Sequence, residues 1–219
     1  MSTLLEFKHV TGNSRKFALH NIDFSMEKGY IMGLAGRNGA GKTTLLNYIL
    51  SEESRYEGEI LLDGRDIRED HVWTMDNIGL VSEDNQFFGV WTVEENAQLL
   101  GAFYSRWNKE LFYTLIEKMQ IDSTKYVKNL SRGEYMKFQM AFAMAHKPLL
   151  YLLDEATAGM DPVYRRDFFQ LLLSVIEQED ASILLTTHSR EELHKRTDYI
   201  GILDQGHLIS FGENREGML

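Results

Sequence analysis

The sequence GRNGAGKT at residues 36–43 has the spacing G-x-x-x-x-G-K-[ST], which is typical of loops that bind phosphate groups. Its glycines allow the backbone to bend so that N–H groups point at phosphate oxygens. We expect the Lys42 ammonium to reach the β- and γ-phosphates of a nucleotide, and the Thr43 hydroxyl to bind Mg²⁺. The residues predicted to hold the nucleotide are Gly36, Asn38, Gly39, Ala40, Gly41, Lys42, Thr43 and Thr44.

Two acidic residues, Asp154 and Glu155, directly follow an apolar run at residues 149–153. Carboxylates at the carboxyl end of a parallel strand lie where open α/β sheets bind ligands. Neighbouring strand residues point in opposite directions, so the two side chains can divide the work. We expect Asp154 to face the metal and Glu155 to accept a proton from the water that attacks the γ-phosphate.

Two further segments could contact an anion. Ser131 and Gly133 precede a helical pattern at residues 135–146, and could present a hydroxyl and backbone N–H groups at a helix N-terminus. Read alone, this segment is only a helix cap. His188 follows the apolar run at residues 183–186, where its imidazole could contact the γ-phosphate or hold Glu155 in place.

The elements that position these residues are read from hydrophobic periodicity and glycine turns. The phosphate loop lies between an apolar strand and a helical pattern, which argues against an ordinary glycine-rich turn with a surface lysine. Continuous apolar runs predict a parallel α/β sheet whose strands are buried on both faces, at residues 30–35, 78–81, 149–153 and 183–186. An N-terminal antiparallel β portion and a closing hairpin are expected at residues 4–8, 19–26, 59–62, 199–203 and 207–211.

Residues 85–147 lack such runs and carry apolar residues at three-to-four spacing, which predicts helices. We therefore expect one domain over residues 1–219. Its nucleotide-binding core is formed by residues 1–84 and 148–219, and residues 85–147 form an inserted helical subdomain.

Composition narrows the class of protein. With 33 acidic and 23 basic residues, the formal net charge is −10, which disfavours binding to nucleic acid. The chain has no cysteine, and a protein in a reducing compartment can fold without disulfides. No uncharged stretch approaches the roughly 20 apolar residues that cross a bilayer, and residues 1–9 do not resemble a signal peptide. We expect a cytoplasmic protein.

In this order, the segments 36–43, 130–134, 149–155 and 158–161, with His188, resemble the motifs of ATP-binding cassette (ABC) ATPases. The resemblance covers essentially the whole chain. It implies a P-loop NTPase (RecA-like) core, ATP and Mg²⁺ as cofactors, and ATP hydrolysis. It also implies a head-to-tail dimer, with an identical or a related cassette chain, in which each ATP lies between the phosphate loop of one subunit and the signature segment, residues 130–134, of the other. On matching positions, Ser131 and Gly133 would contact the partner's ATP, and Asp161 would bridge the interface.

The chain departs from the family pattern at several positions. Arg132 and Glu134 replace a glycine and a glutamine of the usual signature, which is similar to the subset that serves efflux-type permeases, including antimicrobial-peptide exporters. Glu83 stands where a glutamine is usual, and its carboxylate can still bind Mg²⁺ or orient water. The adenine-stacking tyrosine is absent. Phe17 is the nearest aromatic residue, either as a platform for adenine or as a core side chain.

The leading interpretation is an ATP-hydrolysing subunit that drives a separate membrane permease, peripheral on the cytoplasmic face, with export favoured by the resemblance. A soluble ABC-type ATPase acting on DNA or ribosomes is the alternative. The family implies that such proteins carry coiled-coil insertions, zinc-binding cysteines or two cassettes. A phosphotransferase with the same loop would leave residues 130–134 and His188 unexplained. We expect the permease contact at Phe87, Phe88, Val90 and Trp91, unless these side chains pack inside the subdomain.

Overall fold

A computed structural model describes residues 2–13, 18–50, 55–84, 86–157, 162–179, 181–188, 193 and 195–214 of the chain. These residues form strands and helices in a mixed order. In order they are β1 (Thr3–Asn13), β2 (Ala18–Glu27), β3 (Ile31–Ala35), α1 (Lys42–Ile49), β4 (Tyr56–Leu62), β5 (Arg65–Asp66), α2 (His71–Asp76), β6 (Ile78–Ser82), α3 (Val93–Gly101), α4 (Lys109–Lys118), the 3-10 helix η1 (Val127–Asn129), α5 (Arg132–His146), β7 (Leu150–Asp154), α6 (Pro162–Glu179), β8 (Ser182–Thr187), β9 (Tyr199–Asp204) and β10 (His207–Glu213).

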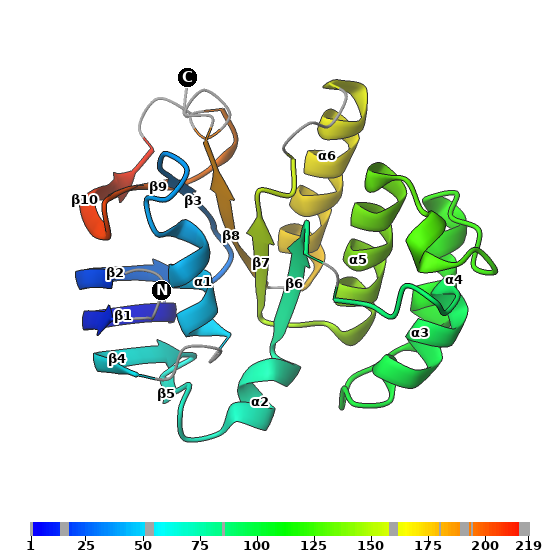
Figure 1. Ribbon diagram of the computed structural model, residues 1–219, viewed down its shortest axis with the longest axis horizontal. Coiled ribbons are helices and arrows are strands. Elements are labelled where there is room, and N and C mark those ends of the chain that lie inside the picture. Colours follow the sequence, from blue (N-terminus) through cyan, green and yellow to red (C-terminus); the bar gives the residue numbers. More distant parts are fainter. Residues whose placement is uncertain are drawn as a thin grey trace.

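The strands form two sheets (Figure 1). A six-stranded sheet has the order β10-β9-β3-β8-β7-β6, in which only β10 runs antiparallel to its neighbour. An antiparallel sheet has the order β2-β1-β4-β5. In the six-stranded sheet, β6 is an edge strand. Strands β3, β8, β7 and β6 run in parallel, so the carboxyl ends of β3, β7 and β6 lie along one margin.

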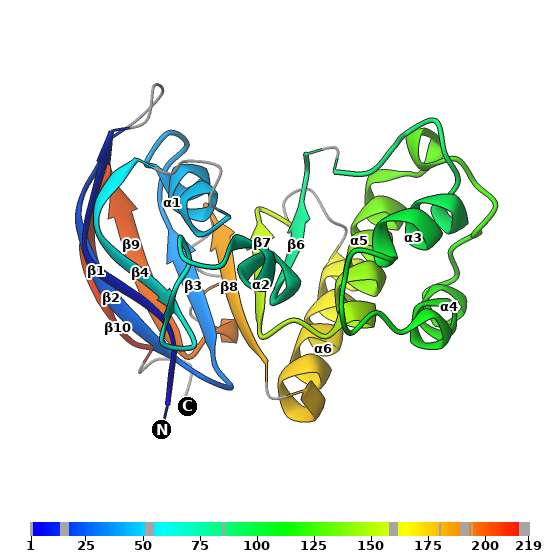
Figure 2. The same cartoon turned by 90° about the horizontal axis from the view of Figure 1, so that it is seen from below.

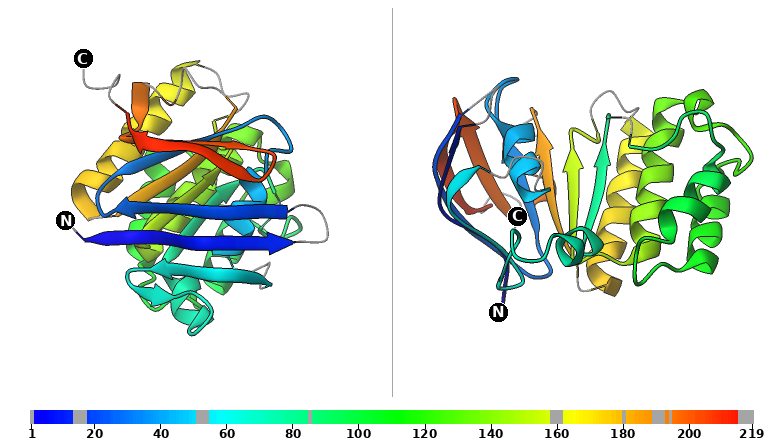
Figure 3. Two further views of the ribbon diagram at one scale, coloured as in Figure 1. Left: turned by 90° about the vertical axis from the view of Figure 1, so that its left-hand side faces the viewer. Right: turned by 60° about the horizontal axis from the view of Figure 1, so that its bottom comes forward.

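The elements are stacked in layers around the six-stranded sheet. Helix α1 lies between the two sheets, α5 and α6 cover the opposite face, and α3 and α4 lie beyond α5 (Figures 2 and 3). Because successive strand residues face opposite sides, the inner strands supply two hydrophobic cores. Leu152 and Leu184 pack with α1 and the antiparallel sheet, whereas Leu153 and Leu185 pack with the helices.

The expected α/β fold is confirmed, and the four apolar runs form β3, β6, β7 and β8 with small differences at their ends. The closing hairpin is also present. Its first strand, β9, pairs in parallel with β3 as well, a partner that the local pattern did not reveal. Helix α2 was not predicted either. Its start is fixed by Asp70, whose side chain accepts a hydrogen bond from the Trp73 N–H.

Helices α3, α4 and α5 occupy the stretch between β6 and β7. The division of the chain at residues 85 and 147 stays a prediction, and the packing does not follow it: Phe138 on α5 and Leu153 on β7 belong to one continuous hydrophobic core. Among the described residues, no helix combines the length and the apolar character that crossing a membrane requires.

Candidate functional site

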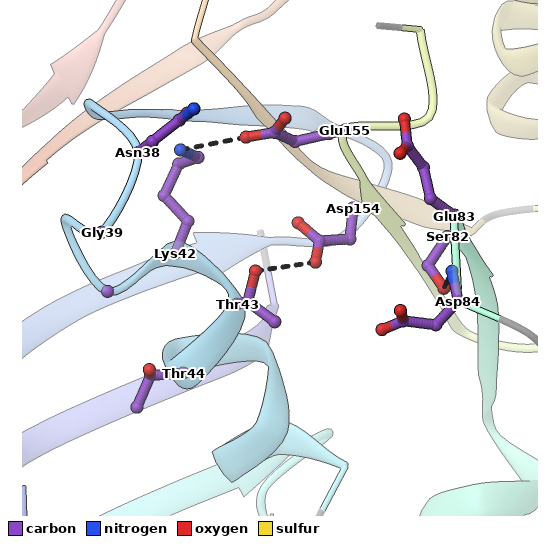
Figure 4. Close-up of a pocket in the computed structure, with 11 residues that line it drawn as sticks. Asn38, Gly39, Lys42, Thr43, Thr44, Ser82, Glu83, Asp84, Asp154 and Glu155 are labelled. Carbon is purple, nitrogen blue, oxygen red and sulfur yellow. Dashed lines mark hydrogen bonds and ion pairs between the residues drawn. The ribbon is translucent and has the colours of Figure 1, made fainter. Parts of the chain in front are cut away.

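A cavity of about 460 Å³ opens at the margin where α1 begins and where β6 and β7 end. Figure 4 shows the phosphate loop on one side and residues 82–84 on the other, with the end of β7 between them. The lining residues are Asn38, Gly39, Gly41, Lys42, Thr43, Thr44, Ser82, Glu83, Asp84, Asp154 and Glu155.

The phosphate loop turns sharply from β3 into α1. Gly39 and Gly41 have φ angles of +79° and +108°, in the region that favours glycine. A Cβ atom on Gly36 would lie 2.6 Å from the Leu203 carbonyl oxygen, so only glycine fits there without a shift. The first turn of α1 faces the cavity, and the positive end of its dipole favours an anion there.

The Lys42 side chain is only 5% exposed, yet its ammonium group reaches the cavity. Nζ donates to the Gly36 carbonyl oxygen at 2.9 Å and lies 3.1 Å from Glu155 Oε1. Figure 4 draws this ion pair across the top of the cavity. The other oxygen of the Glu155 carboxylate lies 3.8 Å from Nδ1 of His188, which is exposed beside it. A cation, a carboxylate and an imidazole thus converge on one point.

Asp154 is held between two hydroxyl groups. Its Oδ2 accepts from Thr43 Oγ1 at 2.9 Å, and its Oδ1 accepts from Thr186 Oγ1 at 2.5 Å. The described residues contain no cluster of three or more His, Cys, Asp or Glu that could hold a metal ion. Mg²⁺ at a nucleotide commonly takes one or two protein oxygens, with phosphates and water as its other ligands. The hydroxyl of Thr43 and the carboxylate of Asp154 are such oxygens.

The opposite side of the cavity, residues 82–84, is held by α5. Gln139 is buried, and its side-chain amide accepts from the Ser82 N–H at 3.0 Å and donates to the Ser82 carbonyl oxygen at 2.8 Å. The Tyr135 hydroxyl donates to the Asp84 carbonyl oxygen at 3.1 Å, and burial raises the pKa of this phenol. Arg132 forms an ion pair with Glu83. Positions 132, 135 and 139 share one helix face, so a single face of α5 contacts all three residues.

The signature segment forms the N-terminus of α5. Ser131 is exposed and caps the helix, because its Oγ accepts from the Glu134 N–H at 3.3 Å. The Glu134 carboxylate accepts from the Ser131 N–H at 2.7 Å and lies 3.0 Å from Lys125 Nζ. These contacts, of which the hydrogen bond from the Ser131 N–H has the largest effect, lower the pKa of the Glu134 carboxyl group to about 2. The Glu134 side chain therefore completes a capping box, as the usual glutamine also would, and its charge adds the ion pair with Lys125.

Most of the predicted nucleotide and metal residues lie around one cavity, but some do not. Gly36 and Ala40 are absent from the lining, and the Ala40 N–H donates within the loop, to the Arg37 carbonyl oxygen. Ser131 and Gly133 lie outside the cavity of their own chain. Phe17 and Asp161 lie outside the described residues.

Several contributing residues were missed from the sequence. Ser82 and Asp84 line the cavity, Thr186 contacts Asp154, and Tyr135 and Gln139 hold the opposite side. The signals available were a hydroxyl side chain at Thr186, directly after the apolar residues 183–185 of β8, and an amide on the apolar face of a helix at Gln139.

The aromatic cluster expected to contact a permease divides into two parts. Phe87 is partly buried and packs against the core, with its ring 4.4 Å from Phe138 and 5.1 Å from Phe142. The packing of Phe87 agrees with the alternative expectation, in which the side chain packs inside the subdomain. Phe88 is 47% exposed and Val90 is 67% exposed.

Comparison with known proteins gives a consistent family. A model of the ABC transporter family matches residues 19–158. The chain is 33% identical to the ABC transporter ATP-binding protein YtrB of Bacillus subtilis (strain 168), over 93% of this chain and 68% of YtrB. It is 28% identical to the methionine import ATP-binding protein MetN of Protochlamydia amoebophila, over 96% of this chain and 64% of MetN. The chain thus spans about two thirds of the length of these curated relatives.

The fold is shared with a solved structure as well. The chain cbiO1 from Clostridium perfringens, described as part of the ABC transporter complex cbiONQ, matches with a TM-score of 0.82 at 23% identity, over 99% of this chain and 90% of that chain. The family match to residues 19–158 includes the phosphate loop, the signature segment and both carboxylates of the cavity. The chain therefore belongs to the ABC transporter family, as one of its ATP-binding and ATP-hydrolysing domains.

Proposed function

We propose that this chain is the ATPase subunit of a transporter, and that it drives a separate membrane permease from the cytoplasmic face of the membrane. The observation that carries the proposal is the convergence of Lys42, Thr43, Asp154 and Glu155 on one cavity at the N-terminus of α1. These four side chains come from two motifs more than 100 residues apart, at the margin where α/β sheets bind ligands.

Each of these groups has a role in hydrolysis that its position supports. The buried Lys42 ammonium and the start of α1 neutralise phosphate charge. The Glu155 carboxylate accepts a proton from the attacking water, and His188 orients that carboxylate. Thr43 and Asp154 hold Mg²⁺, which when bound neutralises the phosphate oxygens. Glu83 lines the same cavity, and we assign it a metal or water contact.

The proposal includes a head-to-tail dimer. Ser131 is exposed, and a Cβ atom placed on Gly133 would meet nothing within 4 Å, so the N-terminus of α5 is open to a second chain. An ATP molecule bound to the phosphate loop of that chain would meet a hydroxyl and a positive helix end. The second chain is either identical or a related cassette.

The permease contact is proposed at Phe88 and Val90. Both side chains are exposed, and the Trp91 ring lies 4.6 Å from that of Phe88. They follow the cavity residues Glu83 and Asp84 closely in the chain, so a permease bound here would lie near the ATP site. Export is proposed on the resemblance of Arg132 and Glu134 to efflux-type members. The name of MetN describes an importer, so the direction has to be measured.

A Glu155→Gln variant tests the paired-site mechanism. It keeps the volume of the side chain but cannot accept the proton, so hydrolysis should fall by about 10² to 10⁴ while ATP binding persists. Two trapped ATP molecules then favour the dimer by mass action. Size-exclusion chromatography with light scattering should show a dimer only with Mg²⁺ and ATP. Adding Ser131→Arg should abolish the dimer, because the longer side chain crowds the site for the partner's phosphate.

A Glu155→Gln chain that binds ATP and stays monomeric at high concentration would contradict the homodimer. Crosslinking on membranes of the native host then tests a pair formed with a related chain. The permease contact is tested in the same membranes. Phe88→Asp should leave ATP binding intact and move the chain to the soluble fraction, whereas the control Val72→Asp, on exposed α2, should stay bound. A wild-type chain that never associates with membranes would favour the soluble ATPase.

A further inference from the structure

We propose that Thr186 is a positioning residue for ATP hydrolysis. Its hydroxyl group fixes both the carboxylate of Asp154 and the backbone turn that presents Glu155. This inference rests on the proposed ATP site and assigns to it a residue outside the phosphate loop, the signature segment and the acidic pair.

The sheet places Thr186 directly beside the acidic pair. Strands β7 and β8 run in parallel with Asp154 paired to Thr186, so the two side chains lie on the same face. Thr186 is 2% exposed, and both functions of its hydroxyl are used. Oγ1 donates to Asp154 Oδ1 at 2.5 Å and accepts from the Glu155 N–H at 3.1 Å. One atom therefore connects the proposed metal ligand to the backbone of the proposed general base.

The two hydroxyl groups that donate hydrogen bonds to the Asp154 carboxylate differ in position. Thr43 lines the cavity and is itself a proposed Mg²⁺ ligand, so its contact with Asp154 Oδ2 lies at the reacting end of the site (Figure 4). Thr186 does not line the cavity, and it holds Oδ1 from within the sheet. With Oδ1 held there, the plane of the carboxylate is fixed and Oδ2 faces the cavity.

The backbone of Glu155 also needs a support. Its φ angle is +48°, a left-handed conformation that residues with a side chain adopt rarely. Such conformations persist where the surrounding structure holds them. The hydrogen bond from the Glu155 N–H to Thr186 Oγ1 supplies such a hold. The turn carries the Glu155 carboxylate to Lys42, with Oε1 3.1 Å from Nζ.

Thr186→Val removes the hydroxyl and nearly preserves the shape of the side chain. Asp154 then loses a donor and the turn at Glu155 loses an acceptor. We expect kcat to fall about 10- to 100-fold, the range that follows from losing a hydrogen bond to a charged group. The KM for ATP should change less, because Lys42 and the loop are untouched. Thr186→Ser keeps the hydroxyl and should restore kcat to within about threefold of wild type.

The experiment measures binding as well as rate. A fluorescent ATP analogue is titrated in EDTA and in Mg²⁺, and bound Mn²⁺ is counted by electron paramagnetic resonance. In EDTA, Thr186→Val should bind the analogue like wild type. In Mg²⁺ the gain in affinity should shrink, and Mn²⁺ binding should weaken by about tenfold. The matched control is Thr74→Val on α2, which removes a buried hydroxyl that donates to the Asp70 carbonyl oxygen at 2.9 Å, away from the cavity. It should leave every readout within twofold.

Three results would overturn the proposal. The first is a Thr186→Val protein with wild-type kcat and metal response. The second is a folded Thr186→Ser protein as impaired as Thr186→Val, because side-chain volume would then matter rather than the hydroxyl. The third is an equal loss of analogue binding in EDTA and Mg²⁺. If Thr186→Val does not fold, Thr186→Cys gives the same comparison, since a thiol is a weak donor. A wild-type chain that neither binds nor hydrolyses ATP would instead overturn the proposed function, and this inference with it.

Discussion

The two sides of the proposed ATP cavity are held in different ways. The phosphate wall consists of residues 36–44, Asp154 and Glu155. It lies at the carboxyl ends of β3 and β7, which are interior strands of the sheet. The edge wall, residues 82–84, ends the edge strand β6 and is held by side chains of α5. The phosphate wall is therefore fixed by the sheet itself, whereas the position of the edge wall depends on where α5 lies.

This difference separates two tasks within one site. Holding the phosphates requires a rigid cradle, and strands with neighbours on both sides supply it. The edge wall carries Glu83, and the helix that holds it also carries Ser131 at its exposed N-terminus. If a second chain displaced α5, the edge wall would move before the phosphate wall, because side chains of α5 hold the edge wall directly. The predictions below test how independent the two walls are.

The largest expected effect comes from breaking the phosphate wall. Lys42→Ala removes the buried ammonium, and steady-state ATP hydrolysis should fall by about 10² or more. The fold should survive, because the helix and the loop remain, and a thermal melt checks this. Lys109→Ala, an exposed lysine at the start of α4, is the control. A folded Lys42→Ala protein with wild-type rates would contradict the assignment of this loop.

Gln139→Leu should loosen the edge wall alone. The substitution leaves the Ser82 N–H and carbonyl oxygen without the amide that bonds both, and the free energy of unfolding should fall by about 2–3 kcal/mol. Urea denaturation measures the loss. Gln98→Leu, which removes an exposed amide bonded to Glu94, should change stability by less than about 0.5 kcal/mol. ATP affinity in EDTA should be unchanged in both variants. A parallel loss of affinity in Gln139→Leu would show that the two walls are coupled.

Lowering the pH should reduce the stability of the protein through His146, at the C-terminal end of α5. His146 is buried beside the Tyr104 ring, at a centroid distance of 4.0 Å, and burial lowers its pKa to about 4. The unfolded chain binds a proton at this residue below about pH 6.5, whereas the folded chain does not until about pH 4. Stability therefore falls as the pH drops through this window. His146 should account for a loss of about 2 kcal/mol in the free energy of unfolding between pH 7.5 and pH 5.

Urea denaturation at pH 7.5 and pH 5 tests this contribution. His146→Phe keeps an aromatic ring and should flatten the pH dependence, while His71→Gln, on the exposed start of α2, should not. The same slope in wild type and His146→Phe would show that another group is responsible.

The smallest effect is expected at Glu83. Its ion pair with Arg132 is exposed and contributes little to stability. Glu83→Gln keeps an oxygen that can bind Mg²⁺ or water, so ATP hydrolysis should fall less than about tenfold, and less than in Glu83→Ala. The Mg²⁺ concentration at half-maximal rate is the measurement. Equal losses in the two variants would show that the charge itself matters.

The phosphate wall could be predicted from sequence because each of its two segments, residues 36–44 and 154–155, is a short local motif that directly follows an apolar strand. The edge wall could not. Gln139 contacts Ser82 across 57 positions, and nothing in either segment specifies the other. Thr186 was missed for a related reason, since its pairing with Asp154 depends on the register of β7 and β8. Parallel strands are joined by long crossovers, and local pattern does not fix their register.

The amide of Gln139 also bears on how the chain avoids aggregation. β6 is an edge strand, and edge strands offer unpaired N–H and C=O groups on which another chain can add a strand. Gln139 bonds both groups of Ser82, as a peptide unit of a further strand would. Nearby, Ala143 packs so close to Gly79 that an added Cβ would lie 3.0 Å from its methyl group. Helix α5 thus closes this edge against strand addition, and a chain with α5 undocked would expose an aggregation-prone edge.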